Sequence, residues 1–350
     1  MSFRLPVLAT IGCLALAPAT ALAHERWFVP KEQQPATDWG GLFSLPVLLA
    51  LVSGAATVAV LALLQRRIGD PLWPRPPFFQ RLEPCAPAIL GVQAAIAIVF
   101  AASRLQLFVP NIELPHNAIG VGVALLAVVA AFSFITGVLT RVGALLIAAL
   151  LVAAFGFADH PEEVIEHVIF VGIAFYLVAV GRGVVRYDDR REEDRTELTD
   201  RLLPHALPVL RICAGFSVLV LGFTEKLLNV ELGIAFLQEY PHFNVARELG
   251  IDWFTDRRFV YAVGIVEATA GCALIAGFLP RLVILSLWIP FNLGIAFLPP
   301  QELIGHLPIL STMYVLLVRG TEGIPPPEVS SADAPAQRPA AVHATRGAPG

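Results

Sequence analysis

The sequence predicts an all-α protein, a polytopic transmembrane helical bundle of about nine spans. Hydrophobic residues make up 56% of the chain, charged residues only 15%, and the mean hydropathy is +0.71. A soluble domain of this length needs more charge to cover its surface. The apolar residues also fall into blocks of about 17 to 22, the helix length that crosses a bilayer core. Lipid cannot satisfy an exposed backbone, so these blocks are expected to be helical.

The first 23 residues are expected to be a secretory signal peptide. MSFR supplies a basic start, an apolar core follows, and Ala21-Leu22-Ala23 forms a small-residue cleavage site. Cleavage leaves His24 as the first residue of the mature chain, within HERWFVP. Residues 24–42 are then a periplasmic N-terminal segment.

The apolar blocks of the mature chain predict one extra transmembrane helix, 43–64, followed by eight further spans. These lie at 87–107, 118–136, 142–157, 163–180, 206–224, 258–278, 282–298 and 302–318. Arginines gather in alternate loops, which indicates a bacterial inner (plasma) membrane protein with a periplasmic mature N-terminus and a cytoplasmic C-terminus. Residues 184–204 form a charged cytoplasmic linker, and residues 321–350 a disordered cytoplasmic tail.

The chain contains an internal repeat. ITGVLTRVGALLIAALL (135–151) parallels IAGFLPRLVILSLWIPF (275–291), so that Arg141 aligns with Arg281. Each unit has an even number of spans, and both therefore start on the same side of the membrane. We expect two parallel four-helix repeats, 87–183 and 205–320, related by a pseudo-two-fold axis along the membrane normal.

Three stretches carry a resemblance to a known family: LRICAGFSVLVLGFTEKLL (210–228), VGIVEATAGCALIAGFLPRL (263–282) and ELIGHLP (302–308). They resemble the DoxX family of four-helix membrane proteins, closely over 205–320 and more loosely over 87–185. That family includes the DoxD-type subunit of thiosulfate:quinone oxidoreductase. The resemblance implies a redox-associated subunit, with quinone as a possible cofactor and a periplasmic or membrane redox protein as partner.

Glu267 is the most costly residue of the predicted spans, because it lies near the middle of one. An ionised carboxylate costs several kcal/mol there. We expect Glu267 to be protonated or paired with a polar neighbour, and Asn292 lies at a similar depth on the next helix. The pair is interpreted either as a device that fixes helix register, as a site of proton or quinone chemistry, or as part of an ion path.

Two Glu-x-x-x-His pairs occupy equivalent positions in the repeat, Glu163 with His167 and Glu302 with His306. Side chains four residues apart share one helix face, and His160 falls on the same face as the first pair. Imidazole and carboxylate suit zinc, copper or iron, so His160, Glu163 and His167 are candidate metal ligands. The alternatives are a quinol site or simple helix-start preference, because the helix dipole favours Glu in a first turn.

Other polar residues are weaker candidates. Arg211 together with Glu225 and Lys226 is a candidate cofactor-binding set, or else a snorkelling arginine and an interfacial anchor. His24 is able to chelate copper through its amine and ring once it becomes the N-terminus, or it is incidental. Trp27 and Phe28 are expected in the aromatic belt.

Three functions from different classes therefore remain open. The first is a quinone-interacting subunit or accessory of periplasmic electron or sulfur chemistry, and the second a periplasm-facing protein that binds or transfers a copper-like ion. The third is a non-catalytic membrane scaffold. The sequence offers no nucleotide site, nucleophile triad or nucleic-acid patch, and the bilayer is its one evident partner.

The predicted topology is testable with reporter fusions. Because the arginine-rich loops stay in the cytoplasm, fusions after residues 115 and 160 should report periplasm, and a fusion near residue 192 should report cytoplasm. N-terminal sequencing of the purified protein should begin at His24. A cytoplasmic signal at residue 160 would reverse the topology and remove the periplasmic placement of the histidines.

Overall fold

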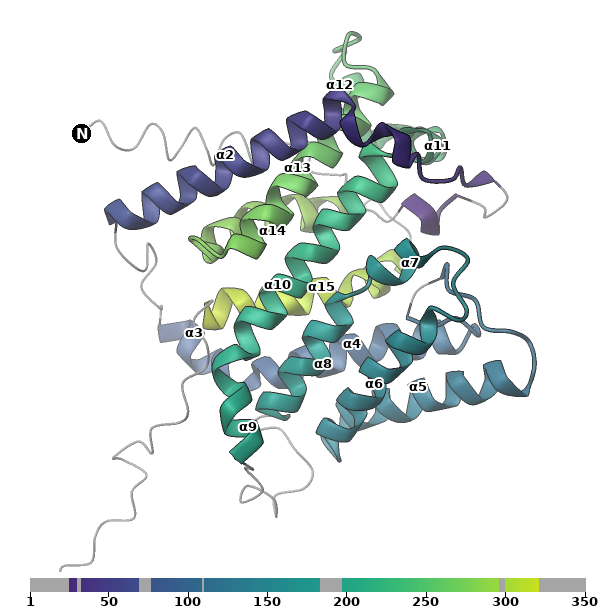
Figure 1. Ribbon diagram of the computed structural model, residues 1–350, viewed down its shortest axis with the longest axis vertical. Helices are drawn as coiled ribbons and strands as arrows, with labels where there is room; N and C mark the ends of the chain where they lie inside the picture. The colour runs from purple at the N-terminus through teal and green to yellow at the C-terminus, as the bar shows by residue number, and fades with distance from the viewer. Residues whose placement is uncertain are drawn as a thin grey trace, which may run out of the picture.

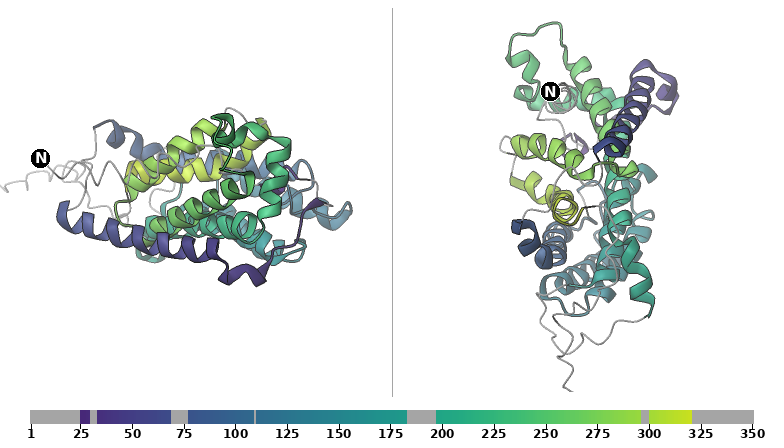
Figure 2. Two further views of the ribbon diagram at one scale, coloured as in Figure 1. Left: turned by 90° about the horizontal axis from the view of Figure 1, so that it is seen from above. Right: turned by 90° about the vertical axis from the view of Figure 1, so that its left-hand side faces the viewer.

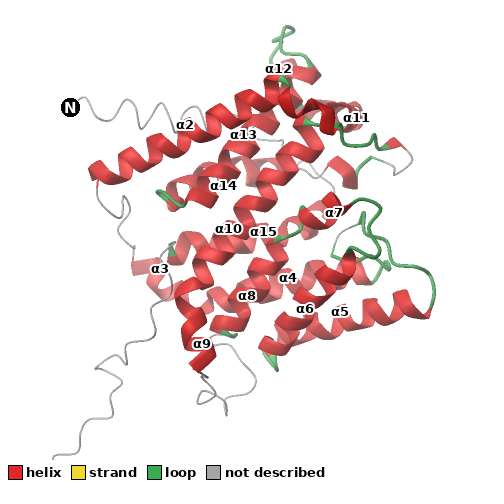
Figure 3. Ribbon diagram, viewed as in Figure 1, coloured by secondary structure: helices red, strands yellow, loops and turns green. Residues whose placement is uncertain are grey.

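The computed structural model describes residues 25–29, 33–68, 77–108, 110–182, 197–295 and 300–320. Within these ranges the chain is helical throughout (Figures 1 and 3), with one isolated bridge between Gln106 and Glu113 in place of any strand. The predicted all-α membrane class is confirmed. The predicted signal peptide, His24, most of the predicted linker and the predicted tail lie outside the described residues.

A helix occupies each predicted span. They are α2 (Leu45–Ile68), α4 (Ala86–Ala102), α5 (Ala118–Thr136), α6 (Thr140–Ala154), α7 with α8 (Pro161–Ile165 and Ile169–Val180), α10 (Ala206–Leu221), α13 (Asp256–Ala276), α14 (Pro280–Ile295) and α15 (Pro300–Arg319). In the described part of the chain, 6 helical stretches are long and apolar enough to cross a membrane. Residues 140–154 and 303–319 form shorter apolar helices. The count of nine spans stays a prediction.

Short helices cover the ends of the long ones. They are α3 (Pro77–Leu82), α9 (Glu197–Leu202), α11 (Val230–Glu239) and α12 (Val245–Glu248). The helix α9 lies in the segment predicted to be a linker, and a 3-10 turn over 203–205 joins it directly to α10. The second unit therefore begins earlier than its apolar residues indicate.

The helices follow the same neighbour order in both predicted repeats. In the first unit α4 packs on α5, α5 on α6, α6 on α8, and α8 returns to α4. In the second unit α10, α13, α14 and α15 close a ring in the same order. The units join where α8 meets α10 and where α15 meets α4, while α2 lies along α13 (Figures 1 and 2). This order is the one expected of a pseudo-two-fold, and the symmetry itself stays a prediction.

The aligned sequence motifs also have the same local geometry. Gly137 and Gly277 end α5 and α13 with φ of 81° and 77°, the left-handed conformation that favours glycine. Arg141 Nε donates to Val178 O, and Arg281 Nε donates to Leu317 O, each at 2.9 Å. Each arginine thus satisfies a carbonyl at the end of the fourth helix of its unit.

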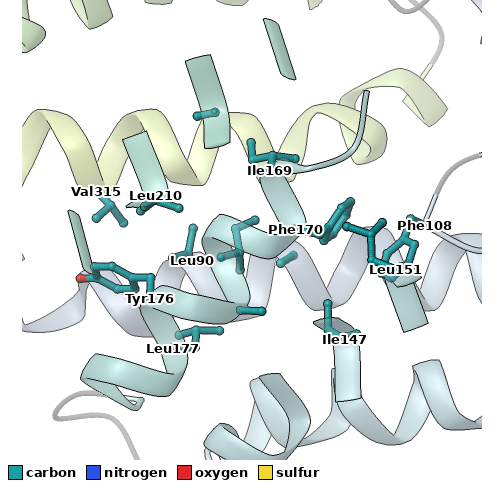
Figure 4. Close-up of a cluster of buried hydrophobic side chains, with 14 of the residues drawn as sticks. Leu90, Phe108, Ile147, Leu151, Ile169, Phe170, Tyr176, Leu177, Leu210 and Val315 are labelled. Atoms are coloured by element: carbon teal, nitrogen blue, oxygen red, sulfur yellow. The ribbon is translucent and has the colours of Figure 1, made fainter. Parts of the chain in front are cut away.

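One apolar core runs through both units (Figure 4). Leu90, Phe170 and Tyr176 of the first unit pack in the same cluster as Leu210 and Val315 of the second. The helices approach closely because small residues lie between them: a Cβ at Gly215 would come within 2.9 Å of Gly271 O. This shared core fixes the two units against each other.

Candidate functional site

The segment Glu25–Val29 enters one end of the bundle, although it lies outside every apolar block of the sequence. Glu25 and Arg26 are each only 5% exposed, in a 3-10 turn over Glu25–Trp27. Ionisable side chains are rarely buried this deeply unless they are paired. Their partners come from α7, from the end of α10 and from α13.

Lys226 lies between two carboxylates. Its Nζ is 2.7 Å from Glu25 Oε2 and 3.2 Å from Glu267 Oε2. The backbone N–H of Glu25 donates to Glu225 Oε2 at 2.9 Å. Glu225, Lys226 and Glu267 are 0%, 1% and 3% exposed. Lys226 is therefore the polar neighbour that Glu267 was expected to have, while the side chain of Asn292, the neighbour proposed from sequence, lies outside the described residues.

Arg26 lies among carboxylates of both units. Its Nε is 3.7 Å from Glu166 and 3.8 Å from Glu225, and its Nη1 is 3.9 Å from Glu163. Its Nη2 donates to Thr37 Oγ1 at 3.1 Å, and that hydroxyl donates to Glu162. We call the eight charged residues the buried charge cluster: Glu25, Arg26, Glu162, Glu163, Glu166, Glu225, Lys226 and Glu267.

A π-helical turn, Gly222–Leu227, brings three consecutive polar residues into the cluster. Thr224 donates to Glu166 Oε1, Glu225 accepts from Glu25, and Lys226 pairs with Glu267. These three successive side chains point in different directions, and each meets a partner from a different segment of the chain. π-Turns of this kind are frequent at functional sites.

Two glycines bring the π-turn close to α13. A Cβ at Gly264 would lie 2.9 Å from the Cβ of Lys226, and one at Gly222 would lie 3.1 Å from the Cβ of Glu267. Larger residues at either position would push Lys226 and Glu267 apart. The pair therefore depends on Gly222 and Gly264.

Residues 33–44, which we call the strap, hold the segment Glu25–Val29 in place. Asp38 N–H donates to Leu228 O, and Asn229 Nδ2 donates to Pro35 O. Gln34 Nε2 donates to the carbonyls of Arg26 and Val29. These bonds tie the segment to the end of the π-turn before the chain enters α2.

The cluster holds more acidic groups than basic ones, with six carboxyl groups and the two cations Arg26 and Lys226. Burial raises the pKa of Glu25 well above its ordinary value, against the opposing effect of Lys226. For Arg26, burial lowers the pKa of the guanidinium, but Glu166, Glu225 and Glu163 more than reverse this and leave that pKa raised. The arginine therefore stays charged.

The aromatic residues of the segment pack inside the protein. The Trp27 ring lies edge-on to His306, with ring centroids 6.2 Å apart. Phe28 makes edge contacts with Phe236 and Tyr240 of the region around α11. Both rings are half-buried and face the protein beside the buried anchor at Glu25–Arg26, and their place in the aromatic belt stays a prediction.

Beside Trp27 lies a cavity of about 260 Å³, which we call the aromatic cavity. One face of α4, the loop after it, the start of α15 and the N-terminal segment form its walls. Arg104 lies over the Phe100 ring at 3.7 Å and, with Gln106, is one of its polar side chains. The lining residues are Trp27, Phe28, Ala97, Phe100, Ala101, Arg104, Gln106, Phe108, Pro110, Ile304 and Gly305.

The histidines expected to act together are separated. Glu163 and His167 are buried, and His167 Nδ1 lies 2.7 Å from Glu163 O, whereas His160 is exposed. The helix is interrupted between Ile165 and Ile169, and His160 stands outside its first turn as the N-cap. His306 is also buried, while the side chain of Glu302 lies outside the described residues.

Arg211 does not join Glu225 and Lys226 in one cofactor site. It lies near the opposite end of α10, where its Nη1 donates to the carbonyls of Leu274 and Ile275 at the end of α13. About four turns of helix separate it from Glu225, roughly 21 Å at helical rise. Arg211 caps a helix, and Glu225–Lys226 forms a buried site of its own.

Sequence reasoning missed Glu25, Arg26, Glu162 and Glu166. The usable signal was charge balance, since a carboxylate in an apolar span, such as Glu267, requires a partner, and the Glu25-Arg26 pair of HERWFVP was left without a role.

Among the described residues, no three His, Cys, Asp or Glu side chains are placed to hold a metal ion together. Comparisons with protein-family models, curated proteins and solved structures find no match for this chain. The function is therefore inferred from the site, together with the sequence resemblance.

The ion pairs of Lys226 make a testable prediction about stability. Lys226→Met should destabilise the protein by about 3–5 kcal/mol, because it leaves two buried carboxyl groups without their cation. Glu267→Gln should cost about 1 kcal/mol, since Gln still accepts a hydrogen bond and Lys226 keeps Glu25. Thermal unfolding in detergent measures both. Equal losses in the two variants would contradict the central position of Lys226.

Proposed function

We propose that this membrane protein is a quinone-interacting subunit or accessory of periplasmic electron or sulfur chemistry. In this proposal the aromatic cavity receives the ring of a quinol and the buried charge cluster takes up its protons. The observation that carries it is the position of Trp27, whose ring lines the cavity while its neighbour Arg26 lies in the cluster. A DoxX-type resemblance points to the same class.

The dimensions and lining of the cavity support a single ring system as its occupant. Its volume of about 260 Å³ is slightly below the roughly 300–1,000 Å³ typical of sites for drug-sized ligands. Phe100, Phe108 and Trp27 offer aromatic surfaces for stacking or edge contact, and Gln106 offers a hydrogen bond. A quinone headgroup combines a flat ring with oxygen acceptors.

The charge cluster supports proton transfer. Six carboxyl groups against two cations leave an excess of negative charge that a dry interior disfavours, so the cluster is suited to taking up protons. Glu162 is its outermost member and accepts from Thr37, a half-exposed residue. Protons therefore have an exit to the periplasmic side. Oxidation of one quinol releases two protons and two electrons, and the electrons leave with the redox partner.

Two alternatives are distinguishable in the same sample. A copper-binding protein should retain metal through purification, and a scaffold should retain neither metal nor quinone. Metal analysis and quinone extraction of protein purified from its native membrane separate all three functions. Absence of quinone from such a sample would contradict the proposal.

Filling the cavity tests its occupant. Ala101→Phe places a ring inside the cavity and should lower quinone affinity at least about tenfold, or ~1.4 kcal/mol. The control is Ile96→Phe, which adds the same ring on the exposed face of α4. Quinone titration of both purified variants measures the effect. Equal affinities would place the quinone elsewhere.

Glu267 tests the proton acceptor. Glu267→Gln should abolish quinol-linked proton release while the folded protein still accumulates in the membrane, because Gln holds no exchangeable acid proton. His306→Ala, beside Trp27, should slow release without abolishing it. Proton release is measured with a pH dye in reconstituted vesicles. Wild-type release in Glu267→Gln would return this residue to a purely structural role.

A further inference from the structure

The opposite end of the bundle holds a buried cation that the proposed function does not use. Arg182 follows α8 and is only 6% exposed. Its Nη2 donates to Ile135 O in the last turn of α5 at 3.1 Å. In the described part of the chain, its buried Nε and Nη1 have no acceptor and no carboxylate pairs with it. A guanidinium remains charged at any physiological pH, so Arg182 needs an anion.

The groups around Arg182 also favour an anion. The guanidinium reaches the turn between α5 and α6, where α6 presents its N-terminus at Thr140. A helix N-terminus attracts negative charge, and the Thr140 hydroxyl is buried there with no hydrogen-bond partner among the described residues. Arg141 adds a second guanidinium, with its Nη2 3.9 Å from where a Cβ of Gly181 would be.

In the second unit, protein covers the equivalent turn. There α2 packs along α13, and its Gln65 Oε1 accepts from Leu279 N–H in the turn that leads to α14. In the first unit α5 holds the place of α13, and Leu125, Val129 and Phe132 on it are each at least 60% exposed. The apolar face of α5 is therefore open to lipid where α13 carries a helix.

We propose that an anionic phospholipid lies along α5 in the position that α2 takes along α13, with its phosphate bound by Arg182 and the N-terminus of α6. The acyl chains cover the exposed face of α5. The phosphate oxygens accept from the guanidinium, which binds phosphate in a fixed fork geometry. Basic pockets between membrane helices on the arginine-rich side commonly bind lipid headgroups in this way.

Because no carboxylate of the described residues pairs with Arg182, removing its charge should have different effects on stability without and with anionic lipid. In neutral detergent without lipid, Arg182→Gln should be at least as stable as the wild type, because it removes an uncompensated buried charge. Added phosphatidylglycerol should raise the melting temperature of the wild type by about 4 °C and that of Arg182→Gln by less than about 1 °C. Arg66→Gln, at the end of α2 on the same side, is the matched control and should keep the full shift.

Two further measurements distinguish a lipid phosphate from free phosphate. Phosphatidylcholine and inorganic phosphate should each give little shift, and native mass spectrometry should retain phosphatidylglycerol on the wild type but not on Arg182→Gln. A shift with inorganic phosphate equal to that with phosphatidylglycerol would overturn the lipid assignment. An undiminished phosphatidylglycerol shift in Arg182→Gln would overturn the site.

Discussion

The architecture at one end of the bundle depends on the burial of Lys226 between Glu25 and Glu267. An ammonium in a low-dielectric interior is stable only when anions repay its lost hydration. One carboxylate comes from α13, and the other from the N-terminal segment, some 200 residues away in sequence. Lys226 thus joins the N-terminal segment to the helical core, although the segment is not part of any apolar block.

Several features of the chain have their explanation in this interaction. Gly222 and Gly264 let the backbones approach until Lys226 and Glu267 meet, and the π-turn directs Thr224, Glu225 and Lys226 to three different partners. The strap from Gln34 to Asp38 then holds the segment over the site. Stability of these elements is therefore coupled, and a change at any one should be felt at the others.

The sequence was sufficient for the helical class because apolar length and backbone satisfaction are local properties of the chain. It also predicted the burial of Glu267, from the cost of a carboxylate in a span. It did not predict that Lys226 is its partner, because the pairing depends on a π-turn and on glycine packing between two helices. The burial of Arg26 was not predicted for a similar reason. The segment around Arg26 lies outside the apolar blocks, and the residue is buried only because the segment packs into the bundle.

The N-terminal segment also joins the cavity to the charges, and this has a thermodynamic consequence. Trp27 and Phe28 line the aromatic cavity, while Glu25 and Arg26, in the same short turn, lie in the cluster. We expect a ligand that displaces Trp27 to shift Arg26 relative to its carboxylates and so to change their affinity for protons. By linkage, proton uptake must then change ligand affinity by the same factor. A ligand cavity and a proton site on separate elements would be coupled more weakly, whereas the proposed function places both at one 3-10 turn, Glu25–Trp27.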